Sequence, residues 1–317
     1  MEEGKSWDVI VVGGGPAGLC GAMWLARYRL SVLVVDAEDP RNAPTWAVHG
    51  YFGIEDPKPL ELRELGRRQA VDAGACYQAG MVEKIEGAID DFTVTLADGS
   101  AHRARRILLC TGLKDIVPEI PGFEELYGTS IWHCPDCDGP TIKDLNVGVI
   151  GWGDSTVKYC LYMLTWTDRL TLLTHGHDPE LSEDAKAALE RFGIQVRPHA
   201  IARLEGSNGC LRSVVFLRDQ GVDQEPAEEA EDFDALFFHI ACGPGSTLAA
   251  DLGCELDPDG EWDGNLLIDR NHATTVPGVY AAGDITPGSR LSLRAAAEGA
   301  RAAIGIHKSL IPDDRRF

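Results

Sequence analysis

The sequence contains no apolar run long enough to span a bilayer, and its first residues pass directly into a strand-like pattern without the apolar core of a signal peptide. We therefore expect a soluble, cytoplasmic protein with no membrane contact. Positive charge is also scarce, because 29 Lys and Arg residues against 50 Asp and Glu residues give a net charge of −21. That balance disfavours nucleic acid and anionic membrane surfaces as partners. With 317 residues, of which 44% are hydrophobic, the chain is long enough for two domains with separate cores.

The cysteines indicate neither a disulfide framework nor a metal site. Their number is nine, which is odd, and seven of them stand singly without the spacing of metal ligands. The close pair, Cys134 and Cys137, has no second pair or His pair at zinc-knuckle spacing, so we expect no metal. We expect the seven isolated thiols to fill space in the core, as unreactive cysteines usually do. These seven are Cys20, Cys76, Cys110, Cys160, Cys210, Cys242 and Cys254.

The segment Cys134-Pro135-Asp136-Cys137-Asp138 places two thiols and an acid within one short turn. Two sulfurs at this spacing can close a small ring. The attacking sulfur must be a thiolate, and a neighbouring carboxyl group adjusts how much thiolate is present. The pattern favours dithiol–disulfide exchange, with Cys134, Cys137 and Asp138 as the candidate catalytic residues.

A βαβ unit is predicted at the N-terminus. Residues 8–13 form a continuous apolar run, as in a parallel strand covered on both faces, residues 16–29 have helical periodicity, and residues 30–36 form the next strand. The glycine-rich turn Gly13–Gly18 joins the first strand to the helix, and Asp36 ends the second strand. Backbone N–H groups of such a turn meet a pyrophosphate, and the acid accepts from a ribose hydroxyl. This unit therefore predicts a dinucleotide site.

A second βαβ unit repeats this plan in the middle of the chain. Its first strand is expected at 147–150, a glycine-containing turn follows, the helix reaches Leu164, and the next strand covers 170–173. The other expected segments are a β-hairpin, a linker, two further strands and a return linker. They cover 81–109, 113–128, 211–218, 235–241 and 243–246.

In the order and spacing of these motifs, the sequence resembles the low-molecular-weight thioredoxin reductases over nearly its whole length. The shared segments are the two nucleotide turns, Thr111-Gly112, Cys134–Gly139, Val276–Asp284 and Arg294–Gly299. The resemblance implies an α/β fold with two Rossmann-like dinucleotide-binding domains of the thioredoxin reductase type. The FAD-binding domain would be discontinuous and comprise 1–115 and 245–317. Residues 116–244 would form the second nucleotide-binding-like domain, which carries the redox cysteines.

The same resemblance implies a homodimeric, flavin-dependent disulfide oxidoreductase with FAD as its cofactor. Cys137 would face the flavin, Cys134 would attack the disulfide of the partner, and Asp138 would be the general acid. Asp284 would bind the ribityl chain, and the helix N-terminus around Arg294 would stabilise negative charge on the reduced ring. The residues expected to contact the cofactor are Gly13, Gly15, Pro16, Ala17, Asp36, Ala37, Arg41, Asn42, His49, Val82, Thr111, Gly112, Gly283, Asp284, Arg294, Ala295 and Ala296.

The sequence departs from this family at the second nucleotide site. Ordinary members end the second strand with a His-Arg-Arg cluster that binds the 2′-phosphate of NADPH, whereas the run Leu172–Asp178 contains no arginine and ends in an acid. Trp152 stands inside the glycine turn, where a small residue is usual, and Thr156 takes the third small position. We therefore expect NADPH to be a poor donor, and His175 and His177 to face solvent or to replace the arginines weakly.

Several functions remain open from the sequence. Electrons could come from a reduced ferredoxin or another flavoprotein and pass to a thioredoxin-like protein, or a small dithiol could be oxidised with oxygen as the acceptor. An ordinary NADPH-dependent thioredoxin reductase and a flavin-bound redox-sensing scaffold are the remaining candidates. The loop 41–53 lacks the family's usual Gln-rich sequence and resembles loops of members that act on small dithiols or use another donor, and His49 is either a loop histidine or a flavin contact. An acidic ferredoxin would need a basic patch, for which the candidates are Arg103-Arg105-Arg106, Arg67-Arg68 and Arg315-Arg316.

Overall fold

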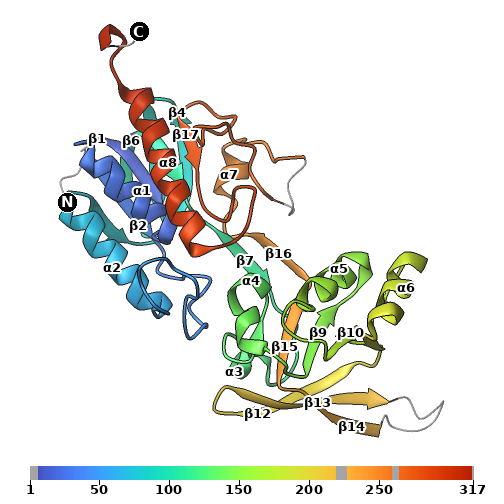
Figure 1. Cartoon of the computed structure of the whole chain (residues 1–317). Helices are drawn as coiled ribbons and strands as arrows, with labels where there is room; N and C mark the ends of the chain where they lie inside the picture. The colour runs from blue at the N-terminus through green and yellow to red at the C-terminus, as the bar shows by residue number, and fades with distance from the viewer. Residues whose placement is uncertain (1–5, 219–226, 259–263, 316–317) are drawn as a thin grey trace. The chain divides into compact units, whose positions relative to one another are not determined.

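The computed structural model describes residues 6–218, 227–258 and 264–315, and its contacts divide the chain into two compact units (Figure 1). Unit 1 comprises Met1–Ala43, Gly50–Asp115 and Cys242–Phe317, and unit 2 comprises Pro44–His49 and Ile116–Ala241. Each unit contains segments that are distant in the sequence.

Two strands that pair with each other carry the chain between the units: β7 (Leu113–Ile116) and β16 (Ala241–Pro244). The short segment Pro44–His49, which the sequence places in the first domain, belongs to unit 2 by its contacts. The stretch 113–128 is not an element-free linker, because it contains β7 and the helix α3 (Phe123–Leu126). Pairing between segments more than a hundred residues apart leaves no local periodicity, so the sequence does not reveal it.

Unit 1 is built on a seven-stranded sheet with the order β3-β2-β1-β6-β5-β4, in which β17 also pairs with β6. Strands β3, β2, β1, β6 and β17 run parallel, whereas β4, β5 and β6 pair antiparallel as a meander. The strands are β1 (Ser6–Val12), β2 (Val32–Asp36), β3 (Cys76–Ala79), β4 (Val82–Ala88), β5 (Asp91–Leu96), β6 (Ala101–Leu109) and β17 (Val279–Ala281). The predicted first βαβ unit and the hairpin at 81–109 are both present.

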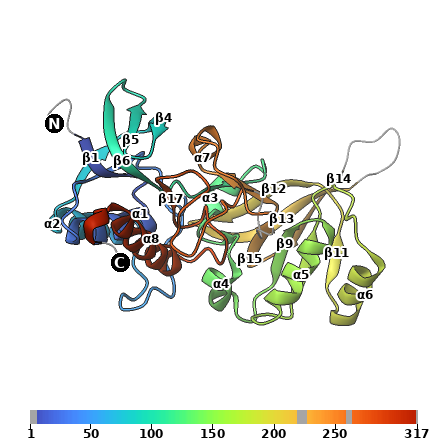
Figure 2. The same cartoon turned by 90° about the horizontal axis from the view of Figure 1, so that it is seen from above.

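Three helices of unit 1 lie together, with α1 (Pro16–Arg27) in contact with α2 (Pro59–Asp72) and with α8 (Ser292–Leu310) (Figure 2). Helix α1 has Pro16 at its first position, where no backbone N–H is needed. Helices α1 and α8 approach closely because glycines stand at their crossing. A Cβ added to Gly299 would lie 2.0 Å from the carbonyl oxygen of Ala17. The short elements α7 (Leu248–Asp251) and η2 (Asp313–Arg315) complete the described helices of this unit.

Unit 2 contains a five-stranded parallel sheet with the order β11-β10-β9-β15-β8 and a three-stranded antiparallel sheet with the order β12-β13-β14. The predicted second βαβ unit is formed by β9, α5 and β10. The strands are β8 (Ile131–Trp132), β9 (Val147–Gly151), β10 (Leu170–Leu173), β11 (Gln195–Arg197), β12 (Ile201–Ser207), β13 (Cys210–Arg218), β14 (Ala227–Asp232) and β15 (Ala235–His239). The helices are α4 (Pro135–Asp138), η1 (Gly139–Ile142), α5 (Gly153–Met163) and α6 (Glu183–Phe192).

Each unit has its own hydrophobic core on both faces of its parallel sheet. Along β1, Val9 and Val11 pack with the residues of α1 and α8, whereas Ile10 and Val12 pack into the cluster on the opposite face. The same alternation explains why the strand appears as a continuous apolar run in the sequence, since both faces are covered. Burial of each aliphatic side chain contributes about 1.5–3 kcal/mol. The separate cores of unit 2 are formed in the same way.

Among the described residues, no helix is long and apolar enough to cross a membrane. The prediction that the isolated cysteines fill the core is correct for three of them and wrong for the others. Cys110, Cys160 and Cys254 are buried, Cys20 and Cys242 are half-buried, and Cys76 and Cys210 are exposed. The two exposed cysteines begin strands β3 and β13, and β3 is an edge strand, where the alternation of side chains leaves one face in solvent.

Candidate active site

The turn between β1 and α1 has the close packing that a dinucleotide-binding turn requires. Gly13 has a φ of +106°, and a Cβ there would lie 2.3 Å from the carbonyl oxygen of Cys110. A Cβ on Gly18 would lie 1.9 Å from the carbonyl oxygen of Gly13. At Gly15, by contrast, an added Cβ would meet nothing within 4 Å. The N-terminal backbone of α1 is therefore open on this side, and the site fits the pyrophosphate of FAD.

Asp36 ends β2 with its carboxylate beneath Gly14, where an added Cβ would lie 2.4 Å from the Oδ2 atom of Asp36. The carboxylate accepts hydrogen bonds from the Arg63 guanidinium and from the Tyr77 hydroxyl, the latter at 2.7 Å. Burial alone would raise the pKa of Asp36, but the hydrogen bonds from Arg63, Tyr77 and the Gly14 N–H hold it below its usual value. Asp36 is thus a fixed anionic acceptor, as a ribose hydroxyl needs. The sequence analysis missed Arg63 and Tyr77, which come from α2 and β3.

The second flavin segment lies against the first nucleotide turn. The Gly283 N–H donates to Glu298 Oε2 at 2.9 Å, and a Cβ on Gly283 would lie 3.0 Å from the Cβ of Ala17. The sequence analysis did not single out Glu298, although it lies within the shared segment at the start of α8. Its carboxylate also pairs with Arg294, at 2.5 Å, so the Arg294 side chain is used within the protein. The backbone of Ala295 and Ala296 is in the first turns of α8, as the resemblance implies.

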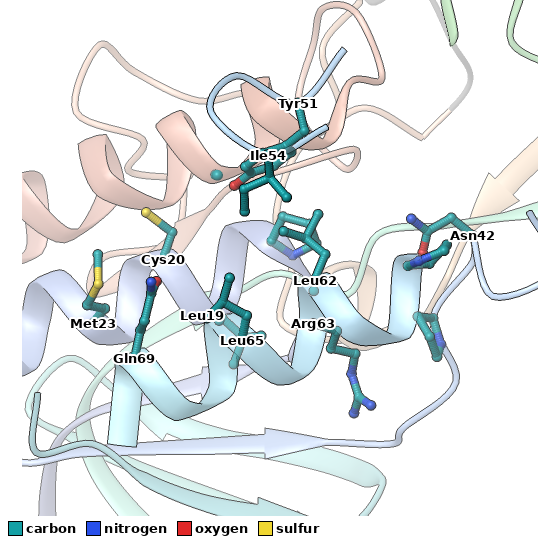
Figure 3. A pocket seen from close by; sticks show the side chains of 16 residues that line it. Leu19, Cys20, Met23, Asn42, Tyr51, Ile54, Leu62, Arg63, Leu65 and Gln69 are labelled. Atoms are coloured by element: carbon teal, nitrogen blue, oxygen red, sulfur yellow. The ribbon is translucent and has the colours of Figure 1, made fainter. Parts of the chain in front are cut away.

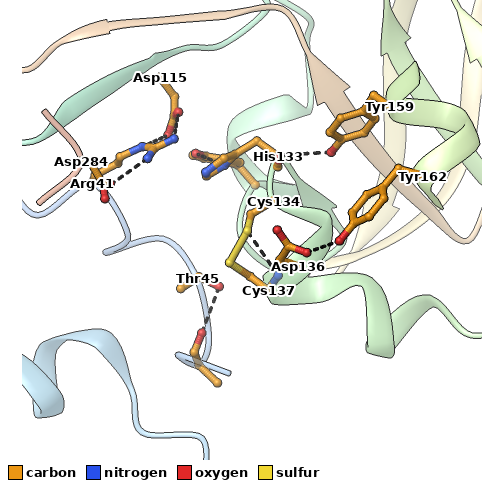
Figure 4. Close-up of a disulfide and its surroundings, with 12 residues drawn as sticks. Arg41, Thr45, Asp115, His133, Cys134, Asp136, Cys137, Tyr159, Tyr162 and Asp284 are labelled. Carbon is orange, nitrogen blue, oxygen red and sulfur yellow. Dashed lines mark hydrogen bonds and ion pairs between the residues drawn. A yellow bond between two sulfur atoms is a disulfide. The ribbon is translucent and has the colours of Figure 1, made fainter. Parts of the chain in front are cut away.

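Arg41 joins two acids of unit 1 (Figure 4). Its guanidinium donates from Nε to Asp115 at 2.9 Å and from Nη1 to Asp284 at 3.1 Å. Asp284, the expected ribityl ligand, therefore already has a charged partner that fixes its side chain. Sequence reasoning selected Arg41 and Asp284 separately and missed Asp115, because ion pairs between distant segments have no sequence signature.

A cavity of about 280 Å³ in unit 1 brings together four of the expected cofactor residues, Gly15, Pro16, Asn42 and Ala296 (Figure 3). It continues along the apolar side chains of α1 and α2. Of the other expected residues, Thr111 and Gly112 follow β6, and the Gly112 carbonyl accepts from the Gly245 N–H at 2.9 Å. Ala37 is exposed after β2, and Val82 begins β4 half-buried.

In unit 2, Cys134 and Cys137 form a disulfide with a Cα–Cα distance of 5.3 Å. The four-residue helix α4 begins directly after Cys134, and the Cys134 sulfur accepts a hydrogen bond from the Cys137 N–H at 3.2 Å. A backbone N–H that is directed at a sulfur favours its thiolate form once the disulfide is reduced. The local geometry therefore suits Cys134 for nucleophilic attack.

Asp138 ends α4 and is only 6% exposed. Burial raises its pKa to about 7, and the charge of His49 opposes this rise. The carboxyl can therefore hold or release a proton near neutral pH, beside the two sulfurs. His49 lies with Asp138 in unit 2, and its ring stands 4.9 Å from that of Trp46. The segment of His49 is held by a hydrogen bond from the Trp46 N–H to the Gly128 carbonyl at 3.3 Å.

Helix α5 and the turn that follows it hold the redox cysteines (Figure 4). The Tyr159 hydroxyl donates to the His133 carbonyl at 3.1 Å, and the Tyr162 hydroxyl donates to the Asp136 carboxylate at 2.5 Å. The hydrogen bond to Asp136 raises the pKa of Tyr162. On the other side of the turn, a Cβ on Gly139 would lie 2.6 Å from the Trp166 ring. The sequence analysis did not select these aromatic residues, because tyrosines on a helix do not indicate which distant turn they contact.

The second nucleotide turn is covered by the loop that follows β10. The N–H of Gly153, the first residue of α5, donates to the Pro179 carbonyl at 2.8 Å, and the Asp154 carboxylate accepts from the Ser182 N–H at 2.9 Å. The ring of Trp152 stacks on that of His177, with centroids 4.0 Å apart and planes at 22°. The helix end that would meet a pyrophosphate is therefore bonded to the chain itself.

The two histidines of this loop behave differently. His175 is half-buried, and its Nδ1 accepts from the Ile201 N–H at 2.9 Å, so it does not face solvent. His177 is exposed and stacks on Trp152. The expectation of solvent-facing side chains therefore holds for His177 and is wrong for His175, because a backbone N–H of the next strand captures the His175 ring.

The arginines proposed as a basic patch are paired with acids in the structure. Arg103 pairs with Asp91, Arg105 and Arg106 share Asp90 at 3.1 and 2.8 Å, and Arg67 pairs with Glu64. Arg316 lies outside the described residues. These arginine runs carry little uncompensated charge. In the portion of the chain that the structure describes, no cluster of His, Cys, Asp and Glu has the arrangement of a metal site.

Two nucleotide-binding-like α/β units, a glycine-rich turn with a terminal acid and a disulfide beside a buried carboxyl group together define the class of flavin-linked disulfide oxidoreductases. A family model described as pyridine nucleotide-disulphide oxidoreductase matches residues 7–300. The chain belongs to this family. It is a thioredoxin reductase-like flavoprotein, which confirms the predicted family, fold class and enzyme class.

The relatives and solved structures agree with this assignment. The thioredoxin reductase of Treponema pallidum is 32% identical over 94% of this chain and 95% of its own length. A relative in Pseudomonas putida, which belongs to an alkyl hydroperoxide reductase, is 28% identical over 97% of this chain, and this chain spans only 59% of that longer protein. The crystal structure of HlmI has a TM-score of 0.86 and 33% identity, covering 99% of this chain and 95% of that one.

Proposed function

We propose that this protein passes electrons between FAD and the Cys134–Cys137 pair, and on to a thioredoxin-like protein or a small dithiol, without NADPH as the donor. The observation that carries the proposal is the closed second nucleotide turn, in which the Gly153 N–H is bonded to the Pro179 carbonyl. A dinucleotide would have to displace the loop after β10 before its pyrophosphate could reach α5.

The contacts that NADPH would need are missing or repulsive in that loop. Thr174–Asp178 offers no guanidinium for a 2′-phosphate, and Asp178 is exposed and acidic. Each charge-assisted hydrogen bond that is lost costs about 1.5–3 kcal/mol, or roughly tenfold or more in affinity. The stacked rings of Trp152 and His177 would also have to separate.

The chain's own residues account for the exchange chemistry. In the reduced protein, the Cys134 thiolate attacks a sulfur of the partner disulfide, and the leaving thiolate takes a proton from Asp138. Cys137 then attacks Cys134, which closes the intramolecular disulfide and releases the second thiol. Residues of the first nucleotide turn, Asp36, Asp284 and the start of α8 would hold FAD. When bound, FAD supplies two-electron exchange with Cys137.

The opposite direction, in which a small dithiol is oxidised and oxygen is reduced, is a second candidate. It is favoured by the ion pairs of Arg103, Arg105 and Arg106, which leave these arginines poorly suited to dock an acidic ferredoxin. A dithiol oxidase needs no site for a separate donor. The dithiol would give two electrons and two protons, and one oxygen molecule would become one hydrogen peroxide.

Anaerobic titration of the flavin absorbance tests the proposal with NADPH, NADH, reduced ferredoxin and dithiothreitol. We expect dithiothreitol to bleach the flavin of the wild-type protein but not that of Cys134→Ser, and we expect neither pyridine nucleotide to do so. Rapid bleaching by micromolar NADPH would return the protein to the ordinary thioredoxin reductases. A flavin that no reductant reaches through the cysteines would favour the sensing scaffold.

A further inference from the structure

One exposed charge lies inside the redox turn. Asp136 stands between the two cysteines and is exposed, whereas Asp138 at the end of the same turn is buried. Figure 4 shows the Asp136 side chain beside the disulfide and directed at the Tyr162 hydroxyl, with which its carboxylate bonds at 2.5 Å. The carboxylate is therefore held in one position next to the sulfurs.

Tyr162 is itself fixed by its surroundings on α5. Its ring packs edge-on against Trp166, with centroids 5.5 Å apart and planes at 84°, and the Trp166 ring abuts Gly139. Tyr162 nevertheless remains 49% exposed. An incoming molecule that reaches the sulfurs would thus meet a phenol and a carboxylate at the surface of unit 2.

We propose that Asp136, positioned by Tyr162, makes the Cys134–Cys137 pair select cationic and neutral disulfides or dithiols over anionic ones. The inference rests on the proposed function, because it presumes that a substrate sulfur bonds to Cys134. A charged group a few bonds from that sulfur would pass within about 5–8 Å of the carboxylate, where one unit charge changes an exchange rate by about three- to tenfold. Asp136 is a specificity-determining residue, and Tyr162 is a positioning residue.

The charge effect applies in both directions of electron flow. In reduction, the Cys134 thiolate forms a bond to one sulfur of R–S–S–R, and the R–S–S–R bond breaks to release R–S⁻. Cys137 then attacks Cys134, releasing the second R–S⁻, so that the substrate gains two electrons and the cysteine pair loses two. Oxidation of a dithiol passes through the same mixed disulfide in reverse. The substrate charge therefore lies near Asp136 in either case.

The experiment uses the FAD-loaded protein, reduced with one equivalent of dithiothreitol under anaerobic conditions. Three disulfide probes differ in charge: cystamine is cationic, 2-hydroxyethyl disulfide is neutral and dithiodiglycolate is anionic. The rate of exchange with each probe is divided by the rate at which free dithiothreitol reduces the same probe. We expect the wild-type ratio of cystamine to dithiodiglycolate to be about tenfold or more at low salt.

The variants separate charge from position. Asp136→Asn should bring this ratio close to one, and Tyr162→Phe should lower it part of the way. Asp184→Asn removes the same charge from α6 of unit 2 and should leave the ratio unchanged. In the unmutated protein the preference should fade as ionic strength rises, because salt screens exposed charges.

The outcomes distinguish this inference from the proposed function. A wild-type ratio near one, a ratio that is insensitive to salt, or a ratio unchanged by Asp136→Asn would each overturn the charge selection. If no probe reacts, the neutral one included, the proposed exchange through Cys134 fails as well.

Discussion

At the scale of single residues, Asp138 has the most altered chemistry. It is buried with a pKa raised to about 7, so it is protonated in acid and increasingly ionised above neutrality. As the proposed general acid, it should protonate the leaving thiolate below that pH. Asp138→Asn should lower disulfide exchange by about a hundredfold or more. Stopped-flow rates between pH 5 and 9 should fall through neutrality in the wild type and stay flat in the variant.

The same shift predicts a change in stability with pH. Because the folded pKa of Asp138 lies above its unfolded value, the stabilising contribution is complete below the unfolded pKa and is lost as pH rises through about 7. Each pKa unit corresponds to about 1.4 kcal/mol. Denaturant unfolding of Asp138→Asn should therefore weaken less than the wild type between pH 4 and 8, and parallel curves would contradict the raised pKa.

The two cysteines should show different roles. With Cys134→Ser, the thiolate that remains at Cys137 should give a long-wavelength charge-transfer band with oxidised flavin. With Cys137→Ser, Cys134 keeps its place at the start of α4 and should be trapped as a mixed disulfide with the partner. Absorbance spectra and mass spectrometry of the intact protein measure the two outcomes. If each variant alone kept full disulfide-reducing turnover, the assignment of roles would be wrong.

The residues that sequence reasoning found are those whose chemistry depends on near neighbours. Gly13, Gly18, Asp36 and the pair Cys134–Cys137 have their partners within one turn or one βαβ unit, so spacing alone indicates them. Arg63, Tyr77 and Tyr162 act across α2, β3 and α5. Nothing in their own segments shows which distant carboxylate each one contacts, and for that reason only the structure identifies them.

At the scale of helices and strands, the crossing of α1 and α8 positions the first nucleotide turn. A Cβ on Gly299 would lie 2.0 Å from the Ala17 carbonyl, and backbone cannot move away as a side chain can. Gly299→Ala should therefore destabilise unit 1 by about 1–3 kcal/mol or more and weaken FAD retention, because Ala17 belongs to the turn. Thermal unfolding and the flavin content after gel filtration measure both effects.

Ala297→Ser provides the matched control, since Ala297 is exposed on the same helix two residues away. That variant should keep its flavin and unfold within about 0.5 kcal/mol of the wild type. Equal behaviour of the two variants would mean that the close approach of α1 and α8 does not support the cofactor turn.

The elements also show where periodicity was enough and where it was not. The strands and helices of both βαβ units were predicted within a few residues, because apolar runs and helical periodicity are local. The pairing of β7 with β16 was missed, and so was the membership of Pro44–His49 in unit 2, since both depend on contacts between segments far apart in the chain.

At the scale of the whole molecule, the two units have separate cores and different nucleotide turns. The turn of unit 1 is open at Gly15, whereas the turn of unit 2 is closed by the loop that bears Pro179. A ligand stabilises only a folded part that binds it, by about 2.7 kcal/mol at a hundred times its dissociation constant. FAD and NADPH should therefore affect the unfolding of the molecule very differently.

Differential scanning calorimetry of the wild-type protein should show two transitions, one for each core. We expect added FAD to raise the transition of unit 1 by a few degrees and to leave the other unmoved. NADPH should move neither, because the Gly153 N–H is bonded to Pro179 and the loop offers no guanidinium. Gly299→Ala identifies the unit 1 transition, since it should lower that transition alone. A rise of the second transition with micromolar NADPH would show that the loop opens readily, and it would remove the basis for a donor other than NADPH.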